Sequence, residues 1–116
     1  MAVELSQVVI DCADPERLAA FWCEVLGWQV VDRDEDDVEI GGSGDGPTLL
    51  MGRAPDAKVG KNHLHLDLTP TGDQQAEVDR IIGLGARRVD LGQGDVSWVV
   101  LADPEGNEFC VLRGTA

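Results

Sequence analysis

The side chains best suited to chemistry gather in the second half of the chain. His63, His65 and Asp67 alternate along one predicted strand and therefore share one of its faces. The leucines between them share the other face, which we expect to pack on a core. Histidine titrates near neutral pH, so His65 is a candidate general acid or base. The alternative left open is a hydrogen-bonded histidine on a half-exposed strand.

Two further candidates, Glu108 and Cys110, lie two residues apart in the last predicted strand and share a face. Cys110 could serve as a nucleophile if His65 lies within hydrogen-bond reach, but no third group that would orient His65 is evident. Trp98 belongs to the preceding strand. It either stacks on a ligand or packs in the core.

Asp11 and Asp67 are expected to occupy corresponding strand positions in the two halves of the chain. If both face one cleft, they favour a cationic ligand group, or one carboxyl has a raised pKa. The alternative, which the usual exposure of aspartate favours, places both at strand ends in water.

The segments that must position these residues repeat once. Leu26-Gly27-x-x-x-Val31-Asp32 matches Leu84-Gly85-x-x-x-Val89-Asp90, 58 residues further on (84 − 26), which is half of the 116 residues. Each half consists of a strand, a helix and three strands. This pattern predicts a single domain over 1–116, with modules at 5–53 and 63–113 and a linker at 54–62.

Local signals place the elements of each module. Asp14-Pro15 starts the first helix and Gly27 ends it, while Gly85 ends the second. The charged run 32–37 predicts an exposed hairpin tip. The strands are predicted at 5–10, 28–31, 38–40 and 48–52 in the first module, and at 63–68, 88–91, 97–101 and 108–112 in the second.

The composition restricts the class of partner. With 22 acidic and 9 basic residues the net charge is −13, which argues against nucleic acids and anionic membranes. Three cysteines without metal-type or redox-type spacing fit reduced thiols. Neither a signal peptide nor a membrane span is predicted, so a cytoplasmic location is expected.

Three segments in order resemble the vicinal oxygen chelate superfamily, which includes glyoxalase I, bleomycin-resistance proteins and extradiol dioxygenases. They are 7–14 with the following Phe21-Trp22 and Val25-Leu26-Gly27, 63–68 with Leu84-Gly85-Ala86, and 102–108. The closest similarity is to the small glyoxalase-like domains. The resemblance implies an α+β fold of two βαβββ modules whose curved mixed sheets enclose a cavity, and a homodimer.

In the metal-using families four side chains meet in that cavity, and the resemblance carries them to Gln7, Leu50, His65 and Cys110. Divalent Ni, Fe or Mn in such enzymes needs histidine and carboxylate ligands, and no carboxylate falls on these positions. We therefore expect no metal. If one binds, His65, Gln7 and Glu108 are the expected ligands, and the ion would polarise substrate oxygens.

The resemblance favours binding of a small molecule in the cavity without metal, as in antibiotic-sequestering members. One alternative is a metal-dependent lyase, isomerase or dioxygenase acting on a small oxygenated substrate, and another is a non-catalytic interaction module. His65 is the expected catalytic residue if the protein is an enzyme. The expected ligand-binding residues are Gln7, Asp11, Leu50, His63, Asp67, Trp98, Glu108 and Cys110.

Overall fold

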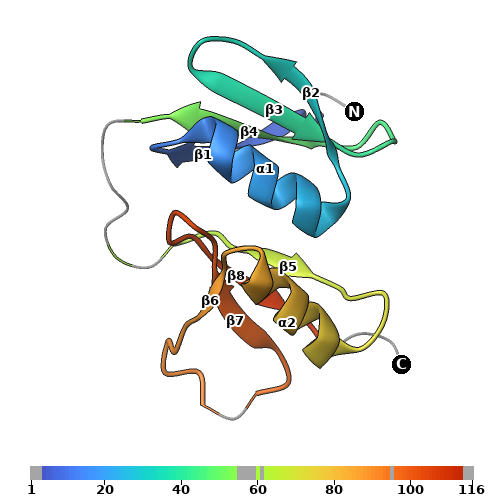
Figure 1. The fold of residues 1–116 in the computed structure, drawn as a ribbon, viewed down its shortest axis with the longest axis vertical. Coiled ribbons are helices and arrows are strands. Elements are labelled where there is room, and N and C mark those ends of the chain that lie inside the picture. The colour runs from blue at the N-terminus through green and yellow to red at the C-terminus, as the bar shows by residue number, and fades with distance from the viewer. Residues whose placement is uncertain (1–3, 55–59, 61, 95, 114–116) are drawn as a thin grey trace. The chain divides into compact units, whose positions relative to one another are not determined.

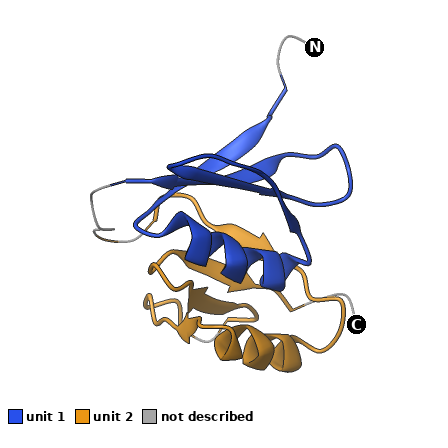
Figure 2. Ribbon diagram, turned by 45° about the horizontal axis from the view of Figure 1, so that its top comes forward, with its two compact units in different colours: residues 1–57 blue, residues 58–116 orange. Residues whose placement is uncertain are grey.

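The structure is a computed structural model that describes residues 4–54, 60, 62–94 and 96–113. It divides into two compact units, residues 1–57 and 58–116 (Figure 2). Each unit has one helix and one four-stranded mixed sheet (Figure 1). Within the described residues, neither helix is long and apolar enough to cross a membrane. Most of the predicted linker at 54–62 lies outside the described residues.

The first unit has the predicted order of strand, helix and three strands. Its elements are β1 (Gln7–Cys12), α1 (Pro15–Leu26), β2 (Gln29–Arg33), β3 (Asp37–Gly41) and β4 (Thr48–Arg53). The strand order in the sheet is β1-β4-β3-β2. β1 runs parallel to β4, and the other neighbours are antiparallel.

The helix α1 follows the predicted start and stop signals. The Asp14 carboxylate accepts a hydrogen bond from the Arg17 backbone N–H at 3.1 Å, and Pro15 occupies the first turn. Gly27 ends the helix in the left-handed conformation, with φ +69°. The apolar stripe packs against β3 and β4 and supplies the core of the first unit: Leu18, Phe21, Trp22 and Val25.

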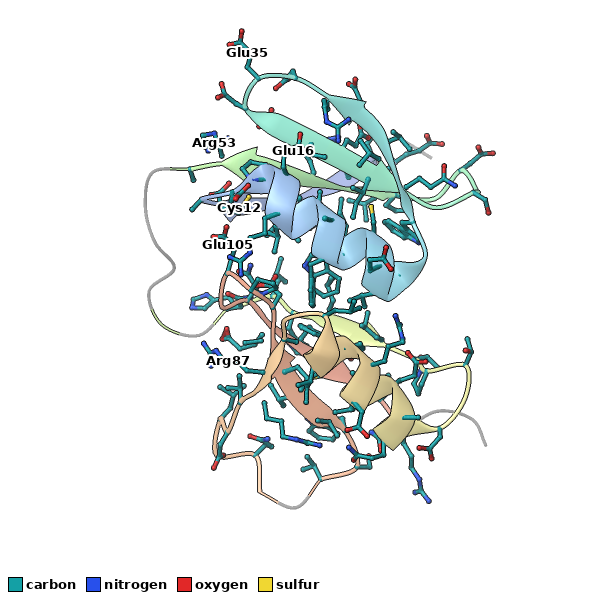
Figure 3. All side chains as sticks on the ribbon, viewed as in Figure 1. Cys12, Glu16, Glu35, Arg53, Arg87 and Glu105 are labelled. Carbon is teal, nitrogen blue, oxygen red and sulfur yellow. The ribbon has the colours of Figure 1, made fainter. Side chains whose placement is uncertain are left out.

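The charged hairpin tip is exposed as predicted, but its strands extend further into the charged run. Asp32 and Arg33 belong to β2, and Asp37 begins β3. The Asp34 carboxylate accepts hydrogen bonds from two backbone N–H groups of the turn, each at 2.9 Å. Glu35 projects from the end of this hairpin (Figure 3). Charged residues are tolerated here because β2 is an edge strand whose residues are all exposed.

The second unit repeats this topology. Its elements are β5 (Leu66–Leu68), α2 (Gln74–Gly83), β6 (Arg87–Arg88), β7 (Val99–Ala102) and β8 (Glu108–Val111). The strand order is β5-β8-β7-β6, with β5 parallel to β8 and the other pairs antiparallel. The α+β class and the two βαβββ modules are thus confirmed.

Several predicted boundaries in the second unit are wrong. The strand expected at 63–68 begins only at Leu66, because His63 and Leu64 form a bend. Leu64 was expected in the core and is 81% exposed. The other predicted strands are also shorter, and α2 ends before Gly85, whose φ is +126°. Short strands with few alternating apolar residues leave the ends of the periodic pattern poorly defined.

The turn between β7 and β8 is built around Asp103, which is only 2% exposed. Its Oδ1 accepts hydrogen bonds from the backbone N–H groups of Glu105 and Asn107, each at 2.9 Å. The Asn107 side-chain amide also donates to this carboxylate. Gly106 completes the turn with φ +89°. This turn fixes the residue at which β8 starts and hence which of its side chains face each side.

Candidate functional site

The register of the second sheet brings the candidate residues to one face. Cys110 in the central strand β8 pairs with Asp67 of β5 on one side and Val100 of β7 on the other. Paired residues of neighbouring strands point to the same face, so these three side chains form a row. His65 and Glu108 each precede this row by two residues. The other two residues of β8, Phe109 and Val111, point to the opposite face of the sheet and are buried.

This face of the sheet forms the floor of a cavity of about 370 Å³, which is within the usual range for small-molecule sites. The wall combines apolar side chains with a few polar ones. The apolar residues are Leu91, Trp98, Val100 and Leu112, and the polar ones are Asn62, His65, Asp67, Gln93, Glu108 and Cys110. Every described lining residue belongs to the second unit.

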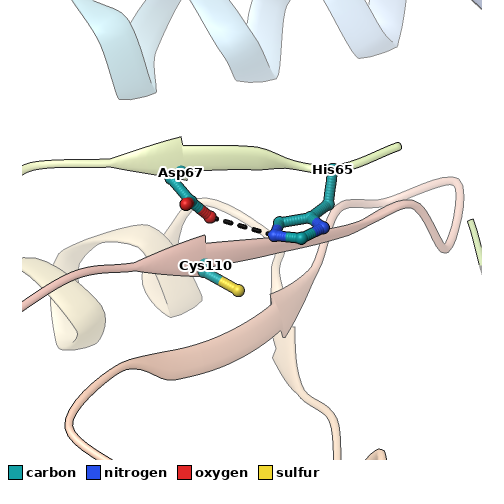
Figure 4. Close-up of side chains that lie close together, drawn as sticks. All are labelled: His65, Asp67 and Cys110. Atoms are coloured by element: carbon teal, nitrogen blue, oxygen red, sulfur yellow. Dashed lines mark ion pairs between the residues drawn. The ribbon is translucent and has the colours of Figure 1, made fainter. Parts of the chain in front are cut away.

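Among the lining residues, His65, Asp67 and Cys110 form a compact cluster (Figure 4). Nε2 of His65 lies 3.1 Å from Oδ1 of Asp67. One potential ligand atom from each of the three residues lies within 4.8 Å of the other two. His65 and Asp67 have side chains that are 44% and 50% exposed, whereas Cys110 is buried. Asp67 therefore provides the group that orients His65, which the sequence analysis did not identify.

Glu108 is a buried carboxylate on the same face. It is 8% exposed, and its Oε1 accepts a hydrogen bond from the Asn62 backbone N–H at 3.0 Å. Glu108 also borders a smaller hollow of about 230 Å³ that Arg87 lines. Arg87 lies on the edge strand β6 and is exposed (Figure 3). Buried carboxylates usually keep hydrogen-bond partners, and the loop at Asn62 provides one here.

Five of the nine predicted site residues line this cavity: His65, Asp67, Trp98, Glu108 and Cys110. His63 is exposed on the bend before β5 and is not part of the described lining. The strand that would have aligned it with His65 does not extend that far.

The remaining three predicted residues, Gln7, Asp11 and Leu50, belong to the first unit and are not among the lining residues of this cavity. Val9 pairs with Leu50 as Asp67 pairs with Cys110. The expected correspondence of Asp11 with Asp67 is wrong, because the offset of 58 between the two modules places Asp67 on Val9 (67 − 58 = 9). The same registers match Leu50 with Cys110, as the sequence analysis placed them.

Several lining residues of the cavity are not predicted from the sequence. Val100 could have been identified from its two-residue spacing to Trp98. Leu91 and Gln93 lie in an irregular loop, where the Gln93 side chain accepts the Leu91 backbone N–H at 2.7 Å. No periodic signal marks loop residues of this kind.

Two βαβββ modules, one of them with a lined cavity on its sheet, define a glyoxalase/bleomycin-resistance type of fold. The chain belongs to the family of glyoxalase-like domains, whose model matches residues 7–112. A search of curated proteins finds no match.

Solved structures share the fold at low identity. A glyoxalase/bleomycin resistance protein/dioxygenase family enzyme from Burkholderia phytofirmans PsJN is 20% identical, with a TM-score of 0.72 over 94% of this chain and 97% of that one. A mutant of the fosfomycin resistance protein FosX from Listeria monocytogenes, complexed with Mn(II) and 1S,2S-dihydroxypropylphosphonic acid, is 16% identical. Its TM-score is 0.72, over 99% of this chain and 93% of that chain. FosX from Mesorhizobium loti is 14% identical, with a TM-score of 0.71 over 99% and 94%.

The residues at the family's metal-ligand positions do not suit a manganese-type ion. Leu50 has no donor atom, and Cys110 offers a soft sulfur where Mn²⁺ prefers carboxylate, carbonyl and water oxygens. Gln7 and His65 leave only one strong ligand in the set. The residues present therefore do not fit the metal that the FosX complex contains.

Proposed function

We propose that this protein binds a small molecule that carries a positive charge beside an apolar portion, in the cavity of the second unit. Binding by this route uses side chains alone and needs no manganese-type ion. The apolar portion packs on Trp98 and Leu112, and the charged group approaches Asp67. A pocket with a mostly apolar wall and a few convergent polar groups is the usual design of such sites.

The charge of the lining is the observation that carries this proposal. Among the described lining residues, Asp67 and Glu108 are acidic, and none is a lysine or an arginine. A cation placed about 4 Å from a half-exposed carboxylate gains at most about 4 kcal/mol at an effective dielectric constant of about 20, and less after solvent screening. An anionic ligand, such as the phosphonate bound by the FosX structure, meets repulsion instead.

Tryptophan fluorescence offers a direct test. Aromatic amines and quaternary ammonium compounds are titrated into the full chain beside neutral and anionic molecules of the same shape. We expect saturable binding of the cations, with Kd raised about 5-fold to 30-fold by Asp67→Asn, equal to about 1–2 kcal/mol. Trp98→Phe separates the signal of this residue from those of the other tryptophans.

A matched control removes the same charge outside the cavity. Asp11→Asn lies on an exposed position of β1 and is expected to leave Kd unchanged. Equal affinity for the anionic and cationic compounds, or equal effects of Asp11→Asn and Asp67→Asn, contradicts the proposal.

A second candidate, a lyase or isomerase with His65 as general acid or base, is favoured by the contact between His65 and Asp67. A carboxylate at 3.1 Å from Nε2 fixes the ring orientation and leaves Nδ1 for a substrate. Turnover of a small carbonyl compound that is lost in His65→Gln and reduced in Asp67→Asn supports this candidate. Unchanged turnover in both variants excludes it.

A further inference from the structure

We infer that the cavity of the second unit binds an N-substituted diamine, in which an apolar group, a first ammonium group, a short spacer and a second ammonium group follow in that order. This ligand class rests on the proposed function, which places one positive charge at Asp67, and it adds a second ammonium group at Glu108. The register of the strands that form the cavity floor supports both the second group and the order.

The cavity floor consists of three successive rows of side chains. The central row contains Asp67, Cys110 and Val100, which are paired neighbours in β5, β8 and β7. Glu108 lies two residues before Cys110 in the chain and Leu112 two residues after it, so both share the face of Cys110. Successive rows are about 6.7 Å apart along the strands. Asp67 is therefore in the middle row, with Glu108 and Leu112 in the rows on either side.

The two outer rows differ in polarity. Continuing the register of β7 and β8 by one residue pairs Trp98 with Leu112, which makes this end apolar, and Trp98 is 40% exposed. At the other end Glu108 is 8% exposed, and its Oε1 accepts the Asn62 backbone N–H at 3.0 Å. A ligand that reaches both ends passes Asp67 on the way. An apolar group, a first positive charge and a second polar group must therefore follow in this order.

The separation of the two acidic side chains determines the length of the spacer. Asp67 and Cys110 are paired in neighbouring strands about 4.8 Å apart, and Glu108 is two residues from Cys110. The Cα atoms of Asp67 and Glu108 are therefore about 8 Å apart. At ordinary bond lengths, a spacer of four or five methylene groups holds two nitrogens about 6–8 Å apart. Each nitrogen then reaches one of the two carboxyl groups.

The surroundings of Glu108 favour an amine as the second group. Asp67 and Glu108 are acidic, and none of the described lining residues is a lysine or an arginine. An ion pair at buried Glu108 is screened less by water and salt than one at half-exposed Asp67. The hydrogen bond from Asn62 uses Oε1 and is compatible with a bound amine. Buried Cys110 and Val100 provide an apolar floor for the methylene spacer.

A series of spacer lengths tests this geometry. N-Benzyl diaminoalkanes with two to eight methylene groups are titrated into the full wild-type chain and followed by tryptophan fluorescence. The comparison compounds are benzylamine and the matched N-benzylamino alcohols, in which a hydroxyl replaces the second amine. We expect the lowest Kd at four or five methylene groups, about 5-fold to 30-fold below that of the matched alcohol. With two methylene groups the second nitrogen does not reach Glu108, so the diamine and its alcohol are expected to bind alike.

Three variants locate the second ammonium group. Glu108→Gln keeps the side-chain shape and an acceptor oxygen, and is expected to reduce the advantage of the diamine over its alcohol to less than about 2-fold. It is expected to change the Kd of benzylamine less than that of the diamine. Asp67→Asn is expected to weaken the diamine, its alcohol and benzylamine alike. The matched control is Glu77→Gln on α2, outside the described lining, and is expected to change no Kd.

The outcomes distinguish the diamine class from the proposed function. Equal Kd values for diamines and alcohols, no dependence on spacer length, or a diamine advantage that persists in Glu108→Gln overturns the diamine class and leaves the proposed function standing. Absence of binding by every amine overturns both. Because the length series uses the wild-type chain, it decides the question even if Glu108→Gln does not fold.

Discussion

Replacing Asp103 by alanine is expected to destabilise the protein by about 3 kcal/mol. The carboxylate is buried and accepts the backbone N–H groups of Glu105 and Asn107, each at 2.9 Å. A hydrogen bond to a charged group contributes about 1.5–3 kcal/mol, and these donors are half-buried, so water recovers part of each loss. Two bonds at the low end of that range give the estimate. It is a large fraction of a total stability of about 5–15 kcal/mol.

Urea denaturation followed by circular dichroism measures this change. Asp103→Asn keeps an acceptor oxygen without the charge and is expected to fall between the wild type and the alanine variant. The matched control is Asp45→Ala, which removes the same charge from an exposed turn between β3 and β4 and is expected to change stability by less than about 0.5 kcal/mol. If Asp103→Ala costs no more than Asp45→Ala, the turn does not depend on this carboxylate.

Three further predictions concern the helices and one thiol. Gly27→Ala is expected to lower the free energy of unfolding by about 1–2 kcal/mol, because the backbone φ of Gly27 is +69°. The added Cβ would meet nothing within 4 Å, so the cost comes from the backbone alone. Gly44→Ala, at a glycine without positive φ, is expected to cost nothing in the same urea assay. Asp73→Ala removes the α2 cap and is expected to cost about 1 kcal/mol, with most of it restored by Asp73→Ser. Burial and then Glu24 raise the pKa of the Cys23 thiol, so its alkylation by iodoacetamide is expected to be slower than that of free cysteine at neutral pH and to accelerate only as the pH rises. Glu24→Gln is expected to quicken the reaction slightly. Mass spectrometry follows the alkylation, and a Cys23 that reacts faster than free cysteine contradicts the prediction.

The parts of the fold that sequence predicted best are those with redundant signals. The helix α1 has a capping aspartate, a first-turn proline, an apolar stripe and a terminal glycine, and its bounds follow them. Strand ends in the second unit had only a short alternation to define them. His63 and Leu64 fit that alternation, yet the chain bends there. Local periodicity cannot reveal where hydrogen bonding to β8 stops.

The site shows the same division. His65 and Cys110 were predicted because strand alternation and the family pattern both point to them, and Glu108 because it shares the strand face of Cys110. Asp67 orients His65 through a direct contact between their side chains, and the two-residue spacing alone does not establish that contact. Leu91 and Gln93 come from a loop whose path is set by hydrogen bonds and by glycines with positive φ. The positions of such loop residues depend on tertiary contacts, and the spacing of residues along the sequence does not predict them.

The repeated topology explains why chemistry can reside in one module only. Both sheets have the same strand order and directions, so each cavity-facing position of the second has a counterpart in the first. The counterparts of Asp67 and Cys110 are Val9 and Leu50, an apolar pair without ligand atoms. Because the backbone framework is the same and the side chains differ, the fold alone does not confer a site. The cation binding that we propose therefore depends on Asp67 of the second sheet, whose counterpart in the first sheet, Val9, carries no charge.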